Sequence, residues 1–428
     1  MDGVSPSRTE WHLTMADDGA YVIIGASLAG AKAAEALRDE GFDGPVVLIG
    51  AERERPYARP ELSKGYLKGK DEREKIYVHP SEWYADHDTE LLLGVPAIAI
   101  DPALHEVALS DGGRVDYGKL LLTTGASPRS LPVPGADLEG VLSLRTVADS
   151  ERIKRAFESA SRVVVIGAGW IGLETAAAAR EAGVEVTVLE SAELPLLRVL
   201  GPEVAQVFAD LHREKGVDLR LGVQVAELTG SGGVVDGVRL ADGTRIPADA
   251  VIVGVGALPN TELAEAAGLE VDNGVRVDAR LRTSVPDIYA AGDVANAFHP
   301  LLGKHIRVEH WANALNQPRT AARSMLGDAD AVYDRVPYFY TDQFDLGMEY
   351  SGYVEPGGYD RVVFRGDVGA REFIAFWLAA DGRLLAGMNV NIWDVNDQVQ
   401  QLIRAATPIN PARLADPNVP LEDLLKGA

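Results

Sequence analysis

The chain has 428 residues, of which 46% are hydrophobic and 25% charged, so its length indicates two or three globular domains rather than one hydrophobic core. It contains no cysteine, which excludes disulfides, thiolate nucleophiles and cysteine-ligated zinc or iron–sulfur sites within this chain. The formal net charge of −23 argues against nucleic-acid binding, and the lack of any apolar run of about 18 residues argues against a transmembrane helix.

Residues 1–19 are polar and mixed in charge, and they lack the apolar core of a signal peptide. They predict a disordered leader on a cytoplasmic protein without a nucleic-acid or membrane partner. The eight histidines are scattered and show neither an HExxH motif nor a paired spacing. We therefore expect no metal site.

A strand–turn–helix–strand unit follows the leader. Residues 21–24 (YVII) are apolar throughout, as in a buried parallel strand, and enter the glycine turn GASLAG at 25–30. A helical apolar stripe covers residues 31–39, and a second strand is predicted at 46–49. Such a unit binds a dinucleotide, because backbone N–H groups at the helix N-terminus receive its pyrophosphate.

This first unit departs from the usual fingerprint at two places. Ser27 takes the place of the middle glycine between Gly25 and Gly30, and Ala51 precedes Glu52, the acid expected to receive the ribose hydroxyls. Serine is small enough to permit close approach of a phosphate. We therefore keep the first unit as a nucleotide site.

A second unit of the same kind fits the fingerprint fully. Residues 163–166 predict a strand, 167–172 (GAGWIG) a glycine turn, 173–182 an alanine-rich helix and 184–189 the next strand. The glycines of the motif are Gly167, Gly169 and Gly172. Two such units in one chain predict two nucleotide sites.

The second strand of this later unit ends in Glu190, about 20 residues after the first motif glycine, where an acid receives the ribose hydroxyls. A carboxylate there repels a 2′-phosphate. No Arg or Lys follows until Arg198. The sequence therefore favours NADH over NADPH.

Each unit is followed by a related strand-and-glycine segment. These segments are LLLTTGASPR at 120–129 and VIVGVGALPN at 251–260, and they indicate an internal duplication. The predicted fold class is α/β, with two Rossmann-like dinucleotide-binding domains and a C-terminal α+β domain. The predicted domains are residues 20–130 with 258–336 around the first nucleotide site, 131–257 around the second, and 337–428 at the C-terminus.

The C-terminal domain is predicted from a change of pattern after Pro337. Strands are expected at 359–365, 371–378 and 384–391, and the turn Ala-Asp-Gly joins the last two. Asp394 is a candidate N-cap for a helix that ends before Pro408.

Taken together, the motifs resemble those of the FAD-dependent, NADH-using ferredoxin reductases of bacterial oxygenase systems, a branch of the glutathione-reductase-like fold. The resemblance runs from about Tyr21 to the C-terminus. It rests on the segments GASLAG, RPYARPELSKGYL, TTGASPR, GAGWIGLE, GVGALPN, YAAGDVA and RVEHWANA, which occur in the order of the family.

This resemblance implies two sets of cofactor-binding residues. FAD is expected at Gly25, Ser27, Gly30, Glu52, Arg59, Lys64, Ala97, Arg129, Gly292, Asp293 and Trp311. NADH is expected at Gly167, Gly169, Ile171, Gly172, Glu190, Arg198, Gly254, Val255, Gly256 and Glu309.

Glu174 is unexpected beside a pyrophosphate site, because like charges repel. The resemblance implies that it pairs with Lys64 of the LSK segment close to the flavin, and we expect these two residues to be catalytic. The alternative is that Glu174 only complements the dipole of its helix and that Lys64 is a solvated loop residue. Some relatives carry a tryptophan where this chain has Tyr340, so the role of Tyr340 stays open.

The absence of cysteine also bears on the electron acceptor. Electrons must leave the flavin directly for an external partner, and the resemblance implies a small iron–sulfur ferredoxin that serves a cytochrome P450 or Rieske-type oxygenase. The protein is expected to be a monomer or homodimer. Two interpretations are open for the cationic residues that lie between positions 53 and 75. They form a basic docking patch, or they belong to a solvated loop whose charge is balanced by Asp71, Glu72 and Glu74. The cationic residues are Arg53, Arg55, Arg59, Lys64, Lys68, Lys70, Arg73 and Lys75.

Three alternatives remain open from the sequence. The first is a rubredoxin or monodehydroascorbate reductase, with the same cofactors and another acceptor. The second is an NADH oxidase. The third is a redox-responsive binding protein resembling apoptosis-inducing factor, in which NADH binding changes association.

Overall fold

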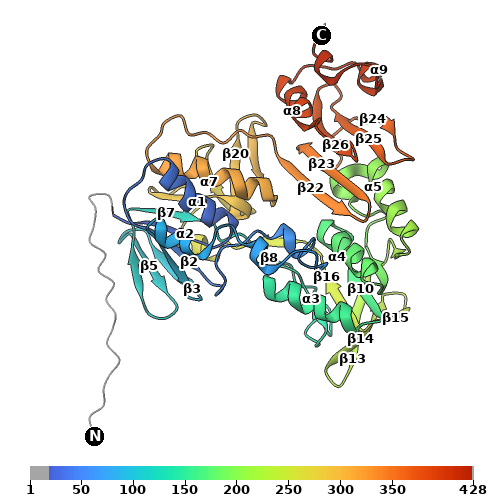
Figure 1. Ribbon diagram of the computed structural model, residues 1–428, viewed down its shortest axis with the longest axis horizontal. Helices are drawn as coiled ribbons and strands as arrows, with labels where there is room; N and C mark the ends of the chain where they lie inside the picture. The colour runs from blue at the N-terminus through green and yellow to red at the C-terminus, as the bar shows by residue number, and fades with distance from the viewer. Residues whose placement is uncertain (1–18, 427–428) are drawn as a thin grey trace. The chain divides into compact units, whose positions relative to one another are not determined.

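The computed structural model describes residues 19–426, so all of the predicted leader except Gly19 lies outside the described residues. The chain forms two compact units (Figure 1). The first unit contains residues 19–58, 77–126 and 259–334. The second contains residues 59–76, 127–258 and the chain from Arg335 onward. The second unit thus holds the residues of two predicted domains, and the three-domain division stays a prediction.

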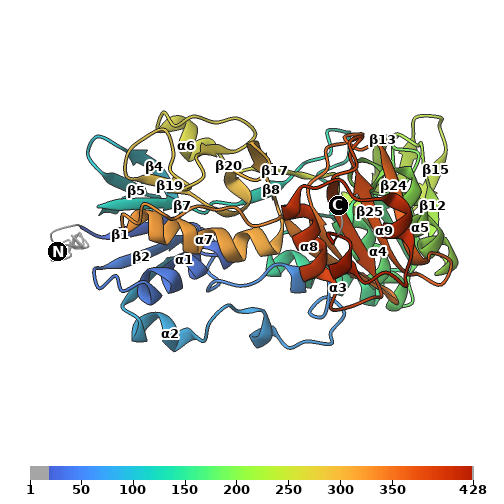
Figure 2. The same ribbon diagram turned by 90° about the horizontal axis from the view of Figure 1, so that it is seen from above.

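The first unit is built on a five-stranded parallel sheet in the order β19-β7-β1-β2-β3. Its strands are β1 (Tyr21–Ile24), β2 (Val46–Gly50), β3 (Thr89–Leu93), β7 (Lys119–Leu122) and β19 (Ile288–Ala290). All four residues of β1 are buried, which explains why the strand is a continuous apolar run. Helices α1 (Leu28–Asp39) and α7 (Trp311–Met325) lie side by side (Figures 1 and 2).

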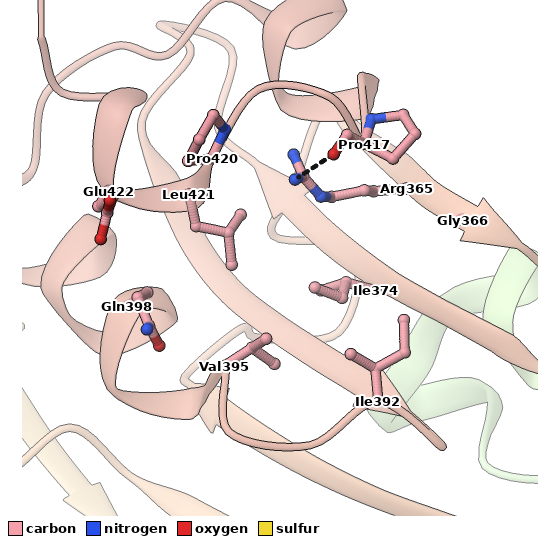
Figure 3. Close-up of a pocket in the computed structure, with 10 residues that line it drawn as sticks. All are labelled: Arg365, Gly366, Ile374, Ile392, Val395, Gln398, Pro417, Pro420, Leu421 and Glu422. Carbon is pink, nitrogen blue, oxygen red and sulfur yellow. Dashed lines mark hydrogen bonds between the residues drawn. The ribbon is translucent and has the colours of Figure 1, made fainter.

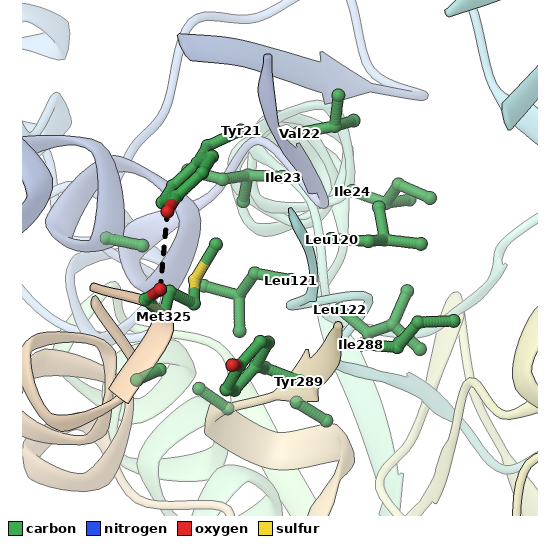
Figure 4. Packing of buried hydrophobic residues seen from close by; sticks show 14 of the residues in the cluster. Tyr21, Val22, Ile23, Ile24, Leu120, Leu121, Leu122, Ile288, Tyr289 and Met325 are labelled. Carbon is green, nitrogen blue, oxygen red and sulfur yellow. Dashed lines mark hydrogen bonds between the residues drawn. The ribbon is translucent and has the colours of Figure 1, made fainter. Parts of the chain in front are cut away.

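The core of this unit gathers around the central strands (Figure 4). Side chains of β1, β7 and β19 pack together, and the Tyr21 hydroxyl donates a hydrogen bond of 3.3 Å to the Met325 carbonyl at the end of α7. The unit also contains two three-stranded sheets. One is antiparallel and consists of β4 (Ala97–Asp101), β5 (Glu106–Leu109) and β6 (Arg114–Asp116), and the other consists of β18 (Val275–Val277), β20 (Ala295–His299) and β21 (Lys304–Arg307). Its short helices are α2 (Ser81–Asp86), α6 (Glu262–Ala266) and η3 (Gly292–Val294).

The second unit contains a parallel sheet with the same arrangement, in the order β12-β11-β10-β16-β9. Its strands are β9 (Val141–Leu142), β10 (Arg162–Ile166), β11 (Glu185–Leu189), β12 (Asp218–Arg220) and β16 (Ala250–Val253), and its helices are α3 (Val147–Ser159), α4 (Trp170–Glu181) and α5 (Leu197–Glu214). An antiparallel sheet of β13 (Val225–Ser231), β14 (Val234–Leu240) and β15 (Arg245–Pro247) follows, as β4 to β6 follow in the first unit. The structure confirms the internal duplication and the predicted α/β fold class.

The C-terminal part of the second unit is an antiparallel sheet in the order β22-β23-β26-β25-β24. Its strands are β22 (Tyr338–Gln343), β23 (Leu346–Gly352), β24 (Arg361–Asp367), β25 (Glu372–Leu378) and β26 (Leu384–Val390), followed by α8 (Asn396–Ala405), α9 (Pro411–Ala415) and η4 (Leu421–Asp423). Three strands were predicted, while β22 and β23 were missed. The buried face of β22 carries the polar residues Thr341 and Gln343, so the strand lacks the alternation of apolar and polar residues that predicts a half-buried strand.

The expected cap of the last long helix was wrong. The N-cap of α8 is Val395, and Asp394 precedes it with a left-handed φ of 62°. Residues 59–76, with η1 (Pro60–Leu62) and η2 (Arg73–Ile76), also belong to this unit. The paired strands β8 (Ala126–Pro128) and β17 (Ala257–Pro259) each include residues of both units. Within residues 19–426, every helix is too short or too polar to traverse a bilayer.

Candidate functional site

The glycine turn of the first unit is closed too tightly for larger residues at its two ends. Gly25 has a φ of 120°, and a Cβ there would lie 2.2 Å from the Thr123 carbonyl oxygen. A Cβ on Gly30 would lie 2.1 Å from the Gly25 carbonyl oxygen. Ser27 is the N-cap of α1 but makes no side-chain capping bond, and the first turn of α1 has no acid to repel a phosphate. The turn therefore fits the pyrophosphate of FAD in spite of its serine.

A second segment of the first unit lies beside this turn. Gly292 begins η3, and a Cβ added to it would lie 3.2 Å from the Cβ of Ala29 in the first turn of α1. The backbone N–H of Gly292 donates to the Gln317 side chain at 2.8 Å, which holds η3 against α7. Asp293 is therefore held near the helix end that would receive the phosphates of FAD.

Three other residues expected for FAD lie at the ends of helices or strands of the first unit. Trp311 is the first residue of α7, so its N–H points out of the helix N-terminus. Desolvation lowers the pKa of the preceding His310 to about 4, against the opposing effect of Asp293, so this imidazole is neutral near pH 7. Glu52 follows β2 and accepts a 2.6 Å hydrogen bond from the Tyr57 hydroxyl, while Ala97 begins β4.

The glycine turn of the second unit divides its roles among three glycines. Gly167 has a φ of 99°, and its Cβ would lie 2.4 Å from the Gly254 carbonyl oxygen. A Cβ on Gly172 would lie 2.0 Å from the Gly167 carbonyl oxygen, so this glycine permits close packing of helix on strand. A Cβ on Gly169 would meet no atom within 4 Å. Open space at the N-terminus of α4 is what a pyrophosphate needs.

Glu190 lies against the same turn. One carboxylate oxygen accepts a 2.7 Å hydrogen bond from the Ala168 N–H, and the other accepts one of 2.9 Å from the Ala192 N–H. These bonds fix the carboxylate next to the place where the ribose of NADH would lie. Ile171 and Arg198 are both exposed, Ile171 in the first turn of α4 and Arg198 near the start of α5.

The remaining expected residues are more dispersed. Gly256 has a φ of 104°, and its carbonyl accepts a 2.8 Å hydrogen bond from the Arg129 N–H, while the Arg129 side chain is exposed. Arg59 precedes η1. Glu309, in the first unit, is exposed and forms an ion pair with Arg307. Their cofactor contacts stay predictions.

Glu174 is the strongest electrostatic feature of the second unit. It lies in α4 with only 4% of its surface exposed. Three donors converge on its carboxylate: the Lys64 ammonium at 2.5 Å, the Thr341 hydroxyl at 2.5 Å, and the Ser63 hydroxyl. The Lys64–Glu174 ion pair expected from the sequence is present, and its catalytic role stays a prediction.

Two of these donors, Ser63 and Thr341, were missed by the sequence analysis. Ser63 precedes Lys64 in the LSK segment, and Thr341 follows Tyr340, so both stand next to residues that had been considered. The Lys64 ammonium lies 5.4 Å from the centre of the Tyr340 ring, within the range of a cation–π contact. Burial, followed by Glu61, Asp342 and Glu174, raises the pKa of Tyr340 to about 12, so its phenol is neutral. Tyr340 therefore belongs to this cluster.

The cations of residues 59–76 are largely paired with acids. Lys68 and Lys70 contact Glu181 at 3.0 and 3.7 Å, while Lys75 pairs with Asp71 at 2.9 Å. Arg73 likewise contacts Glu151 at 2.7 Å. This pairing favours the charge-balanced loop over a free basic patch.

A separate cavity of about 430 Å³ lies within the C-terminal fold (Figure 3). Its wall is mainly apolar, with Ile374, Ile392, Val395 and Leu421 among the lining residues. The Arg365 guanidinium at its edge donates to backbone carbonyls of the last segment of the chain. None of the residues expected for FAD or NADH lines this cavity.

Comparisons with known proteins agree with this geometry. Residues 19–318 match the family of pyridine nucleotide-disulphide oxidoreductases, and residues 338–425 match the reductase C-terminal family. The chain is 42% identical over 412 residues to the ferredoxin–NAD(+) reductase component of the anthranilate 1,2-dioxygenase system of Burkholderia cepacia, covering 95% of this chain and 99% of that protein. It is 40% identical over 412 residues to putidaredoxin reductase of Pseudomonas putida, covering 95% and 97%.

Solved structures give the same picture. The covalent putidaredoxin reductase–putidaredoxin complex matches with a TM-score of 0.91 and 40% identity, covering 96% of this chain and 98% of that one. The ferredoxin reductase of the CYP199A2 system from Rhodopseudomonas palustris matches with a TM-score of 0.90 and 39% identity, covering 94% and 99%.

Proposed function

This chain belongs to the pyridine nucleotide-disulphide oxidoreductase family, and from that premise we propose that it is a ferredoxin reductase that passes electrons from NADH through FAD to a ferredoxin. The observation that carries the proposal is the pair of dinucleotide turns in a chain without cysteine. The family name refers to disulphide chemistry, which this chain cannot perform within itself. Electrons must therefore pass to an acceptor outside this chain, and we propose that it is a protein carrier.

The residues divide the work between the two sites. When bound, FAD supplies the redox chemistry, because its ring accepts a hydride and releases electrons one at a time. The turn from Gly25 to Gly30 and the Gly292–Asp293 segment would hold its phosphate half. The turn from Gly167 to Gly172 would hold the pyrophosphate of NADH, and Glu190 would select NADH by repelling a 2′-phosphate.

Lys64 and Glu174 are proposed to act at the site of hydride transfer. The ammonium of Lys64 supplies positive charge, and the Glu174 carboxylate keeps that charge in a fixed place. A buried ion pair is tolerated only where hydrogen bonds satisfy the remaining polar atoms, as Ser63 and Thr341 do here.

The electron acceptor is proposed from the relatives. Their names place them in dioxygenase systems and in the putidaredoxin system, so we infer a small iron–sulfur ferredoxin that serves a Rieske-type oxygenase or a cytochrome P450. We further infer that the protein acts as a monomer or homodimer.

Anaerobic titration of the purified protein with NADH, then with NADPH, tests the proposal. A yellow protein that NADH bleaches quickly and NADPH slowly is expected, followed by electron transfer to members of a panel of small ferredoxins that includes putidaredoxin. Rapid oxygen consumption without transfer to any ferredoxin would instead indicate an NADH oxidase. A long-lived charge-transfer complex with slow turnover for every carrier would indicate a redox-responsive binding protein.

A further inference from the structure

We propose that Thr341, supported by Gln343 and His212, is a positioning residue that holds the Glu174 carboxylate for its ion pair with Lys64. The C-terminal sheet would then contribute directly to the geometry of NADH oxidation. This inference rests on the proposed function, because it assigns a supporting role toward the Lys64–Glu174 pair.

The four residues form one buried hydrogen-bonded chain. Nε2 of His212 in α5 lies 2.9 Å from Oε1 of Gln343 in β22, and Nε2 of Gln343 lies 3.3 Å from Oγ1 of Thr341. Thr341 donates to Oε1 of Glu174 at 2.5 Å, and β22 packs against α4 (Figure 1). His212 and Gln343 are 0% exposed and Thr341 1%. Water therefore has no access by which it could replace these partners.

The direction of each of these hydrogen bonds follows from which groups can donate and which can only accept. An ionised carboxylate only accepts, so the single proton of the Thr341 hydroxyl points to Glu174. The lone pairs of that hydroxyl then face the Gln343 amide N–H, and the Gln343 carbonyl faces the imidazole. The proton of the neutral ring is therefore on Nε2 of His212. Each of these hydrogen bonds therefore orients the next side chain, from His212 through Gln343 and Thr341 to Glu174.

The surroundings of His212 are consistent with this direction. Burial lowers the pKa of His212 to about 4, against the opposing effect of the hydrogen bond that His212 donates to Gln343, so the ring is neutral at physiological pH. The ring packs against Phe344, with centroids 5.2 Å apart. Its Nδ1 is buried without a hydrogen-bond partner within residues 19–426, so its polar contact is made through Nε2.

The position of Thr341 explains why a polar residue is buried in this strand. Lys64 and Thr341 both reach Oε1 of Glu174, while Ser63 reaches Oε2. Ser63 is the C-cap of the short helix η1 and Lys64 follows it, whereas Thr341 lies within β22, which is paired along its length with β23. Without the hydroxyl, the partners left to Glu174 within residues 19–426 are Lys64 and Ser63, which are neighbours in one segment.

The test compares Thr341→Val, which removes the hydroxyl at nearly constant shape, with Thr341→Ser, which retains it. The matched control is Thr261→Val, because Thr261, which belongs to the first unit, is also buried and donates to a carboxylate, that of Glu265 at 2.7 Å. We expect Thr341→Val to slow flavin reduction by NADH about tenfold, the scale of losing one hydrogen bond to a charged group. Thr341→Ser should stay within about threefold of the original protein, and Thr261→Val should match it.

A second measurement does not depend on turnover. A double-mutant cycle of Thr341→Val and Glu174→Gln, followed by thermal unfolding of the full chain, should show that the two effects are not additive. Additive effects, or a Thr341→Val rate within twofold of the original, would overturn the positioning role. Failure of NADH to reduce the original protein would overturn the proposed function instead, and the cycle would still decide whether Thr341 holds Glu174.

Discussion

The Lys64 ammonium lies 2.5 Å from the Glu174 carboxylate, although 110 residues separate the two in the sequence. Both side chains are largely buried, with 14% and 5% of their surfaces exposed. A charge in such a place is stable only while its partner remains. Replacing one residue of the pair therefore tests whether the pair has a catalytic role.

Replacing Glu174 by Ala should slow flavin reduction by NADH more than about tenfold, because Lys64 loses the group that orients it. Stopped-flow absorbance of the bound flavin measures this rate. The matched control is Glu181→Ala, which removes another carboxylate of α4 that pairs with Lys68 and Lys70 but is 30% exposed. An exposed pair contributes little, so this control should reduce the flavin at the original rate. An equal rate in both variants would contradict the catalytic assignment.

The roles of Gly169 and Gly172 in the second glycine turn can be separated by substitution. Gly169→Ala places a Cβ in space that the protein leaves open, so this variant should fold with an unchanged melting temperature but bind NADH about tenfold more weakly. Gly172→Ala brings a Cβ to 2.0 Å from the Gly167 carbonyl oxygen, so this variant should lose stability. Thermal unfolding and NADH titration together distinguish the two. Equal NADH affinity in the original protein and Gly169→Ala would exclude a pyrophosphate at this turn.

Replacing Glu190 by Gln should raise the ratio of kcat/KM for NADPH over NADH about tenfold, because the charge that opposes a 2′-phosphate is removed. The amide oxygen can still accept one of the hydrogen bonds from the Ala168 and Ala192 N–H groups. Steady-state kinetics with both nucleotides measure the ratio. Glu193→Gln, an exposed carboxylate three residues on, is the control and should leave the ratio where it was.

Stability should depend on pH through His212. Its pKa is about 4 in the folded chain and about 6.5 in an unfolded one, so the unfolded state binds more protons between these values. Its contribution is fully present above pH 6.5 and is lost as the pH falls toward 4. No charged side chain is among the causes of this shift.

Urea unfolding at pH 7 and at pH 5 measures this dependence. Replacing His212 by Gln should reduce the loss of unfolding free energy between the two pH values by on the order of 1–2 kcal/mol. The exposed His87, which lies at the end of α2, supplies the control variant His87→Gln. If the two variants showed the same pH dependence, the burial of His212 would not be a source of acid sensitivity.

The fold and the two nucleotide turns could be read from the sequence, because their signals are local. A buried parallel strand is a continuous apolar run, and the turn needs glycines at set spacings. A Cβ at position 25, 30, 167 or 172 would lie within 2.4 Å of a backbone carbonyl oxygen, so a larger residue does not fit there. The strands at 21–24 and 163–166 were accordingly predicted to within one residue of β1 and β10.

The same argument explains where the sequence analysis was wrong or silent. Strand β22 was missed because its buried face alternates Phe339 with the polar residues Thr341 and Gln343, which is not the pattern of a half-buried strand. The N-cap of α8 was misplaced because a left-handed φ at Asp394 leaves no trace in the residue type.

By itself, then, the sequence determined a cysteine-free α/β protein with two dinucleotide sites, and through its family motifs it also paired Lys64 with Glu174. Only the tertiary structure decided what surrounds that pair. Thr341 is 167 residues from Glu174, and His212 is 131 residues from Gln343. The physical reason is that a buried carboxylate collects donors from whichever segments pack around it, and a single Thr, Gln or His carries no local signal of that packing.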